Sequence, residues 1–135
     1  MHRTRTILTL AAMSLLLAAP PALAGKPTSS SSIRLVLLSA SAVGSVPHWG
    51  NQVTFAVSTT ATDRPYVLLN CYQNGAWLYA AQAGFYASYP FSQVFTLSST
   101  AWTGGAADCK ARLGKLNAYG TKFTELASTS FHVYA

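Results

Sequence analysis

Alternating apolar and polar positions recur along the chain in short segments, one every ten to fifteen residues after position 32. Clusters of Gly, Pro, Asn and Ser separate these segments, which is the pattern of short β-strands joined by turns. No stretch keeps an apolar stripe of helical period with caps over three turns, so no long helix is expected. Seven strands are predicted, over residues 33–39, 52–59, 65–73, 76–82, 91–98, 106–113 and 121–133, and the last is a candidate for a β-bulge. Seven short strands in about 100 residues predict an all-β domain, a single antiparallel β-sandwich.

The phase of the alternation assigns faces to two of these strands. In 52–59, every second residue from Val53 to Val57 is apolar and its neighbours are small or polar, as in a half-buried strand. In 106–113, Cys109 falls on the apolar side, and we expect it to be buried. The outward side of that strand carries Asp108, Lys110 and Arg112.

The dipeptide Asn74-Gly75, which lies between two apolar segments, predicts a β-hairpin. A two-residue turn of type I′ needs positive φ at both central residues, and Asn-Gly is the preferred pair for it. The turn predicts the opposed pairs Gln73–Ala76, Tyr72–Trp77, Cys71–Leu78, Asn70–Tyr79 and Leu69–Ala80.

Opposed residues lie on the same side of a sheet, so the hairpin has two distinct faces. If Cys71 points inward, one face is core and the other is outside, and a slip of one residue would exchange them. The predicted core face carries Val67, Leu69, Cys71, Leu78 and Ala80. The predicted outer face carries Tyr66, Leu68, Asn70, Tyr72, Trp77 and Tyr79.

The first 24 residues have the order of a secretory signal peptide. A basic start with Arg3 and Arg5 precedes an apolar run over 7–19 and a small-x-small site that ends at Ala24. The apolar run is about thirteen residues, whereas a membrane span needs ~20. We therefore expect 1–24 to be removed, 25–32 to be a flexible Ser-rich leader, and 33–135 to form the domain.

Loss of Arg3 and Arg5 with the signal lowers the formal net charge from +6 to +4. The remaining cations are spread singly along the chain and do not form the clustered stripe that tracks phosphates. We therefore expect no nucleic-acid partner, and no integral membrane segment after signal cleavage. The expected location is secreted, either extracellular or associated with the cell envelope.

The chain has two cysteines, Cys71 and Cys109. In an exported domain an even pair is most simply one disulfide. Two thiols without a neighbouring His make a poor metal site, so the structural bridge is favoured over a metal or redox role.

The strands, hairpin and cysteines resemble an immunoglobulin-like domain of exported bacterial proteins, as in small secreted actinobacterial proteins of unassigned function. The segments that carry the resemblance are GNQVTFAVSTT for the second strand, YVLLNCYQNGAWLY for the third strand and its partner, FSQVFTLSS for the fifth, TGGAADCKARL for the sixth and ASTSFHVYA for the last. It covers residues 33–135.

The chain departs from antibody-type domains, which bridge the second and sixth strands. Here Cys71 falls on the third strand, and Ala107 stands two residues before Cys109, where a Tyr is typical. The bridge is therefore expected to join neighbouring strands of one sheet. The likeness implies architecture, not activity.

The sequence gives little support for a catalytic site or a metal site. The mature chain has three carboxylates, no Gly-x-Ser-x-Gly elbow, and two histidines far apart in sequence, His48 and His132. We expect no enzyme activity, cofactor or metal. Trp102 is expected to plug the core at a corner of the sandwich. A hydrolase would require two of Asp63, Asp108, Glu125, His48 and His132 within hydrogen-bonding reach.

The outward aromatic residues favour a non-catalytic binding or adhesion module whose partner is a glycan or a protein. Its hypothetical binding residues are Tyr66, Tyr72, Trp77, Tyr79, Lys110 and Arg112. Two alternatives stay open: a carrier with an aromatic cavity for a small hydrophobic ligand, and a small secreted hydrolase. Whether 83–91, which is rich in Phe and Tyr, covers the aromatic face or extends it is also left open.

Overall fold

The computed structural model describes residues 28–39 and 45–135 of the chain. The predicted signal peptide, 1–24, and the first part of the predicted leader, 25–27, lie outside the described residues. Within the described ranges, no helix is long and apolar enough to cross a membrane.

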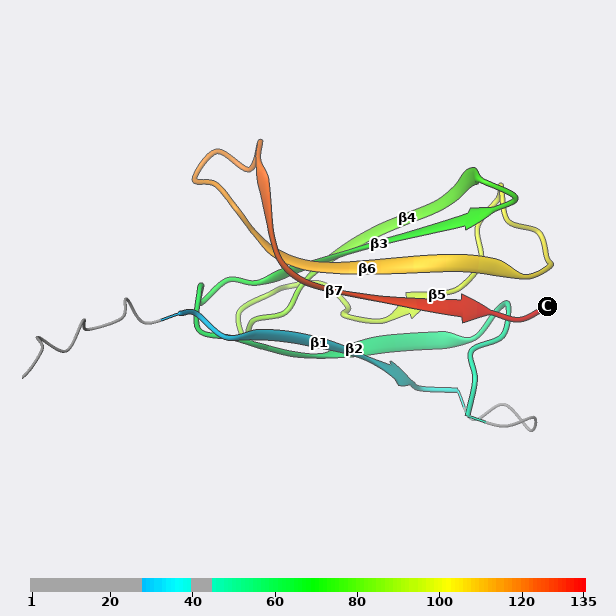
Figure 1. Cartoon of the computed structure of the whole chain (residues 1–135), viewed down its shortest axis with the longest axis horizontal. Helices are drawn as coiled ribbons and strands as arrows, with labels where there is room; N and C mark the ends of the chain where they lie inside the picture. Colours follow the sequence, from blue (N-terminus) through cyan, green and yellow to red (C-terminus); the bar gives the residue numbers. More distant parts are fainter. Residues whose placement is uncertain (1–27, 40–44) are drawn as a thin grey trace, which may run out of the picture.

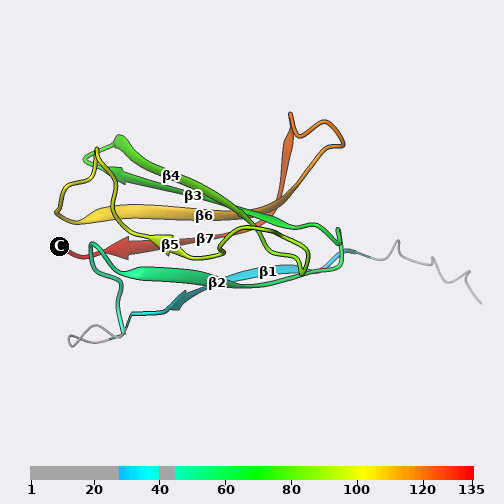
Figure 2. The ribbon, with the colours of Figure 1, turned by 180° about the vertical axis from the view of Figure 1, so that it is seen from behind.

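Seven antiparallel strands form two sheets that pack face to face (Figures 1 and 2). The three-stranded sheet has the order β1-β2-β5, and the four-stranded sheet has the order β4-β3-β6-β7. Their bounds are β1 Ser31–Leu37, β2 Gln52–Thr59, β3 Tyr66–Gln73, β4 Ala76–Gly84, β5 Phe95–Thr96, β6 Ala107–Leu116 and β7 Phe123–Val133. The predicted all-β sandwich is confirmed.

The core lies between the two sheets and consists of apolar side chains from their inner faces. Trp102, in the loop between β5 and β6, is fully buried at one end of the sandwich, as predicted. Its indole Nε1 donates a hydrogen bond of 3.1 Å to the carbonyl oxygen of Gly105. The other members of the hydrophobic core are Val53, Phe55, Val67, Leu69, Cys71, Leu78, Ala83, Phe95, Leu97, Ala107, Cys109, Ala111, Leu113 and Val133.

The bounds of several predicted strands need correction: β1 ends at Leu37 and not 39, β4 extends to Gly84 and not 82, β6 extends to Leu116 and not 113, and β7 begins at Phe123 and not 121. β5 pairs with β2 only at Phe95–Thr96 and not over 91–98. Gln93, two residues before β5, bonds elsewhere: its carbonyl accepts from the Thr54 hydroxyl and its side chain donates to the Gly84 carbonyl. β1 begins at Ser31 instead of residue 33, because Ser31 is already in register with Thr59 of β2.

The Asn74-Gly75 hairpin forms as predicted, with φ of 51° and 79° at its two central residues. The predicted pairs Gln73–Ala76 and Tyr72–Trp77 are confirmed, but a β-bulge at Leu78 makes the remaining pairs wrong. The observed pairs beyond the bulge are Cys71–Tyr79, Asn70–Ala80, Leu69–Ala81, Leu68–Gln82, Val67–Ala83 and Tyr66–Gly84.

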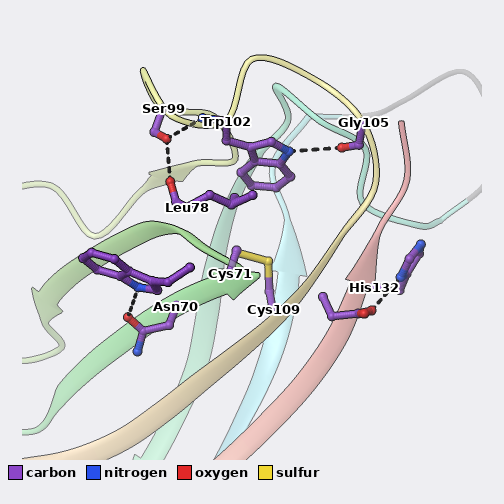
Figure 3. The surroundings of a disulfide bond; sticks show 10 residues. Asn70, Cys71, Leu78, Ser99, Trp102, Gly105, Cys109 and His132 are labelled. Atoms are coloured by element: carbon purple, nitrogen blue, oxygen red, sulfur yellow. Dashed lines mark hydrogen bonds and ion pairs between the residues drawn. A yellow bond between two sulfur atoms is a disulfide. The ribbon is translucent and has the colours of Figure 1, made fainter. Parts of the chain in front are cut away.

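The bulge coincides with a contact from a residue outside the hairpin. Leu78 is buried, and its carbonyl oxygen accepts a 2.7 Å hydrogen bond from the Ser99 hydroxyl (Figure 3). Two residues of the bulged strand, Leu78 and Tyr79, thus oppose the single residue Cys71. Both of them turn towards the core, so the alternation of β4 changes phase after Trp77.

A second bulge lies in β7, the strand for which one was anticipated. Leu113 pairs with Ala127 whereas Gly114 pairs with Glu125, so Leu126 is the extra residue. Figures 1 and 2 show the β6–β7 hairpin bending away from the three-stranded sheet beyond this point. The bulge also sets the register of the rest of β7 against β6.

The disulfide joins Cys71 of β3 to Cys109 of β6, as predicted. The two residues are directly opposed in the β3–β6 ladder, with Cα atoms 4.1 Å apart, so the bridge lies within one sheet. Both cysteines are buried, which confirms the inward phase assigned to them.

Candidate functional site

The outer face of the four-stranded sheet is the side that points away from β1, β2 and β5. Because opposed residues share a side, the ladders order its side chains in rows that cross β4, β3, β6 and β7. The first row is Trp77–Tyr72–Asp108–His132, the second Ala80–Asn70–Lys110–Ser130, the third Gln82–Leu68–Arg112–Ser128, and the fourth Gly84–Tyr66–Gly114–Glu125.

Two large rings stand open on the first row. Trp77 is 63% exposed and Tyr72, directly opposite it, is 41% exposed. The Trp77 indole Nε1 donates a 3.3 Å hydrogen bond to the amide oxygen of Asn70, which is drawn in Figure 3. This bond holds the indole over β3, so the ring is partly fixed before any ligand binds.

The middle of the face is polar and cationic. Lys110 lies opposite Asn70, and Arg112 lies opposite Leu68. Within the described part of the chain, neither cation lies within 4.0 Å of a carboxylate oxygen, and the Arg112 guanidinium is 5.5 Å from the centre of the Phe123 ring. Both positive charges are therefore available to an incoming anion.

Asp108 and His132 form a pair at the β7 side of the first row. His132 Nδ1 and Asp108 Oδ1 are 2.7 Å apart, and both side chains are open to solvent (Figure 3). A carboxylate on Nδ1 orients an imidazole ring, which is one requirement of the hydrolase alternative. His48 lies elsewhere, with Nδ1 3.0 Å from the carbonyl oxygen of Ala135. No group of three or more potential metal ligands occurs in residues 28–39 and 45–135.

The fourth row is closed by aromatic side chains, which we call the aromatic wall: Tyr66, Tyr86, Tyr89 and Phe123. Tyr66 stands between two glycines, and a Cβ on Gly84 would collide with the rings of Tyr86 and Tyr89, as one on Gly114 would with Phe123. The glycines thus leave room for rings to lie on the sheet.

The Tyr66 and Tyr86 hydroxyls share a 2.9 Å hydrogen bond. This bond is the main cause that raises the pKa of Tyr86 above its ordinary value, with smaller contributions from desolvation and charge. The bond therefore holds the Tyr66 ring in the wall beside Tyr86.

The side chains of segment 83–91 lie in three environments, and only some of them cover the outer face. Phe85 packs with Phe55 and Phe95 of the core. Tyr86 and Tyr89 cover the Tyr66 end of the face, whereas Phe91 is 72% exposed beside Tyr89. Trp77 and Tyr72 are left uncovered.

The assignment of Tyr79 to the outer face is wrong. The Leu78 bulge turns Tyr79 inward, where its ring packs edge-on against Trp102 with centroids 6.2 Å apart. Of the six hypothetical binding residues, the structure brings Tyr72, Trp77, Lys110 and Arg112 together, places Tyr66 in the wall, and removes Tyr79 to the core.

Burial raises the pKa of the Tyr79 hydroxyl above its ordinary value of 10.0. The folded state then keeps this proton at a pH at which the unfolded chain has lost it, so stability is fully present below pH ~10 and falls as pH rises through the folded pKa. We expect Tyr79→Phe to weaken this alkaline loss, measured by urea unfolding between about pH 8 and 11. Tyr119→Phe, at an 87% exposed residue, is the control; parallel pH profiles for Tyr79→Phe and the wild type would contradict the assignment.

Three shallow depressions follow the outer face. One of about 440 Å³ lies along the row of Tyr72, Asp108 and His132, and two of about 290 and 240 Å³ flank Asn70 and Arg112. They are open to solvent, and the depression of about 240 Å³ shares lining residues with each of the other two, Tyr72 and Lys110 with one, Asn70 and Arg112 with the other. The face therefore suits an extended ligand that lies on it better than a compact ligand that must be enclosed.

Sequence reasoning missed Ser128, Ser130 and Phe123 as members of this face; the outward position of His132 was predicted from the alternation of the last strand, but its place beside Asp108 was not. The only signal for them was the β6–β7 hairpin register, which the bulge at Leu126 displaces by one residue. Without the bulge, Phe131 would oppose Asp108 and His132 would lie on the core side.

Comparisons with protein-family models, with curated proteins and with solved structures found no match. The fold and the face therefore define the class of this protein by themselves. It is an all-β sandwich, cross-linked within one sheet, that leaves an aromatic and cationic sheet face open.

Proposed function

We propose that the protein is a secreted, non-catalytic binding module that recognises a glycan through the outer face. The observation that carries the proposal is the exposed pair Trp77 and Tyr72, with the indole held over β3 by Asn70. Flat rings with a polar tip pack against the apolar side of a sugar ring and still hydrogen-bond at the rim.

The composition of the face favours a glycan over a protein partner. The centre of a protein interface is depleted in lysine and serine, although arginine and aromatic residues are enriched there. Here the centre is Asn70, Lys110 and Arg112, with serines and an amide around them. Short hydrogen-bonding side chains beside a ring suit a ligand covered with hydroxyl groups.

The sheet composition supports an immunoglobulin-like domain as part of the proposal. In such domains the first, second and fifth strands share one sheet, and the third, sixth and seventh share the other, with an added strand beside the third in variable-type domains. The sheets β1-β2-β5 and β4-β3-β6-β7 follow this division. The disulfide supports export, because such bonds persist in oxidising compartments.

A small hydrolase is the second candidate, because Asp108 and His132 meet its geometric requirement. It would also need a nucleophile or a bound water at His132 Nε2, and no described hydrogen bond joins a side-chain hydroxyl to that atom. Turnover of a bound glycan that is abolished by His132→Asn would favour this candidate. The carrier alternative has less support, since the aromatic side chains inside the sandwich pack against one another.

Trp77→Ala is expected to weaken binding to a glycan array by about tenfold or more, because an exposed aromatic anchor contributes ~2 kcal/mol or more to such contacts. Tyr72→Ala should act in the same direction. Binding is measured on arrays of cell-wall and capsular saccharides with the purified protein.

Tyr119→Ala is the matched control, since it removes an exposed tyrosine from the β6–β7 turn and not from the face. Far-UV circular dichroism establishes that each variant is folded. Unchanged glycan binding by folded Trp77→Ala and Tyr72→Ala, or no glycan binding by the wild type, would overturn the proposed function.

A further inference from the structure

We propose that the ligand of the outer face is an anionic saccharide chain that runs along β3 and β6, between the Trp77–Tyr72 pair and the aromatic wall. This inference rests on the proposed function and adds the charge of the ligand, its direction and its minimum length.

The direction follows from where the rings lie. Aromatic side chains occupy the first row at Trp77 and Tyr72 and the fourth row at Tyr66, whereas the two rows between them carry none. On β3, Tyr72 and Tyr66 are six residues apart, which corresponds to about 20 Å along a strand. A ligand that contacts both ends is therefore a chain of several sugar units parallel to the strands.

The charge follows from the two rows between the rings. Lys110 and Arg112 are successive outward residues of β6, about 7 Å apart along the strand. Both are unpaired with carboxylates in the described part of the chain, and an amide or a hydroxyl stands beside each: Asn70 and Ser130 for Lys110, Ser128 for Arg112. Two such cations on the floor of the face suit two acidic groups on successive parts of one chain.

The two carboxylates of the face, Asp108 in the first row and Glu125 in the fourth, line the depressions beside Lys110 and Arg112. Asp108 is hydrogen-bonded to His132, and neither carboxylate lies within 4.0 Å of Lys110 or Arg112. Lys110 and Arg112 occupy the two middle rows, so the positive charges of the face lie between its ring-bearing rows, where they favour an anion.

The two cations also make a second copy of this chain an unfavourable occupant of the face. Stacking two outer faces across a twofold axis would bring Lys110 and Arg112 of both copies together in the interface centre. Like charges juxtaposed at an interface are costly. The net formal charge of the whole chain is positive as well, so an acidic polymer is the complementary partner.

The test compares acidic polysaccharides with their own carboxyl-reduced, neutral derivatives, so that each pair differs in charge and not in linkage. Poly(glycerol phosphate) is a second anionic probe, which separates a phosphodiester source of charge from a carboxylate source. Mobility of the native protein in gels that contain each polymer gives the affinity. Oligosaccharides of increasing length from the best acidic polymer compete for the site.

The expected results are binding to at least one acidic polymer and at least tenfold weaker binding to its neutral derivative. The double variant Lys110→Ala/Arg112→Ala should lose about tenfold or more in affinity, since it removes two charge-assisted contacts. The control Arg34→Ala/Lys122→Ala removes the same charge away from the face and should bind as the wild type, apart from a small non-specific loss. The affinity of the competing oligosaccharides should rise steeply with their length until they span about 20 Å, the distance between the first and fourth rows.

The outcomes separate this inference from the proposed function. Equal binding of acidic and neutral forms, with Trp77→Ala still impaired, would overturn the anionic ligand and leave the glycan module intact. If Lys110→Ala/Arg112→Ala and the control Arg34→Ala/Lys122→Ala lost the same affinity, the loss would be due to net charge alone. That result would also overturn the inference. No binding to any saccharide, or Trp77-dependent capture of a protein in place of a glycan, would overturn both.

Discussion

Replacement of both bridged cysteines, Cys71→Ala/Cys109→Ala, is expected to lower the free energy of unfolding by about 4 kcal/mol in the chain-entropy model. The bond links residues separated by 38 positions, so its removal releases a long loop in the unfolded chain. Two buried sulfur atoms are lost as well, and alanine leaves part of their volume empty. A domain of this size has ~5 to 15 kcal/mol of stability in total, so the loss is a large share of it.

Urea unfolding of the oxidised wild type, the reduced wild type and the double variant measures this loss. Ser128→Ala/Ser130→Ala, which truncates two exposed residues of the same sheet, is the matched control and should stay within about 1 kcal/mol of the wild type. A loss below about 1 kcal/mol in the cysteine variant would contradict the expected contribution of loop closure. If the reduced wild type and the double variant have the same free energy of unfolding, the loss comes from the disulfide bond itself.

The disulfide also shows which parts of the architecture the sequence could predict. Asp108, Lys110 and Arg112 fix the phase of β6, because three charges cannot share a buried side. The inward position of Cys109 follows from that phase. The Asn74-Gly75 turn needs only local backbone conformations, so the first two pairs of its hairpin were predictable as well. In each case the determinant lies within a few residues of the feature.

The positions of the two bulges could not be predicted in the same way: a bulge was expected in 121–133, but no local signal placed it at Leu126, and the contact at Leu78 comes from a residue distant in sequence. Leu78 is displaced from the ladder where its carbonyl meets the Ser99 hydroxyl, 21 residues later in the chain. Leu126 follows the point at which the β6–β7 hairpin bends out of the sheet (Figures 1 and 2). One extra residue inverts the side of every residue beyond it, which is why Tyr79 was assigned to the wrong face.

The candidate site was accordingly predicted in part. Tyr72 and Trp77 precede the β4 bulge, and Lys110 and Arg112 lie on the regular strand β6, so all four were assigned correctly to the outer side. The wall depends on how 85–91 packs back onto Gly84, a tertiary contact without a local signal. The pairing of Asp108 with His132 depends on the β7 bulge.

Trp102→Ala is expected to lower the free energy of unfolding by about 3–5 kcal/mol, the range for a buried large aromatic residue. The side chain has no exposed surface, and its ring packs edge-on against Tyr79. The substitution also leaves the carbonyl of Gly105 without its indole donor. The loop around Trp102 carries Ser99, which holds the bulge of β4, so the loss should extend to the strand that presents Trp77.

Far-UV circular dichroism during urea unfolding measures the change without depending on tryptophan fluorescence. Trp102→Phe keeps a ring in the core but removes the indole donor, and we expect it to cost about 1–3 kcal/mol, which remains measurable if the alanine variant does not fold. Trp77→Ala is the matched control: it removes an indole that is 63% exposed, and it should cost less than about 1 kcal/mol in stability. If Trp102→Ala were no more costly than Trp77→Ala, the buried ring would not support the bulge. The phase change that separates Tyr79 from the outer face would then need another cause, because no other described side-chain hydrogen bond reaches the Leu78 carbonyl.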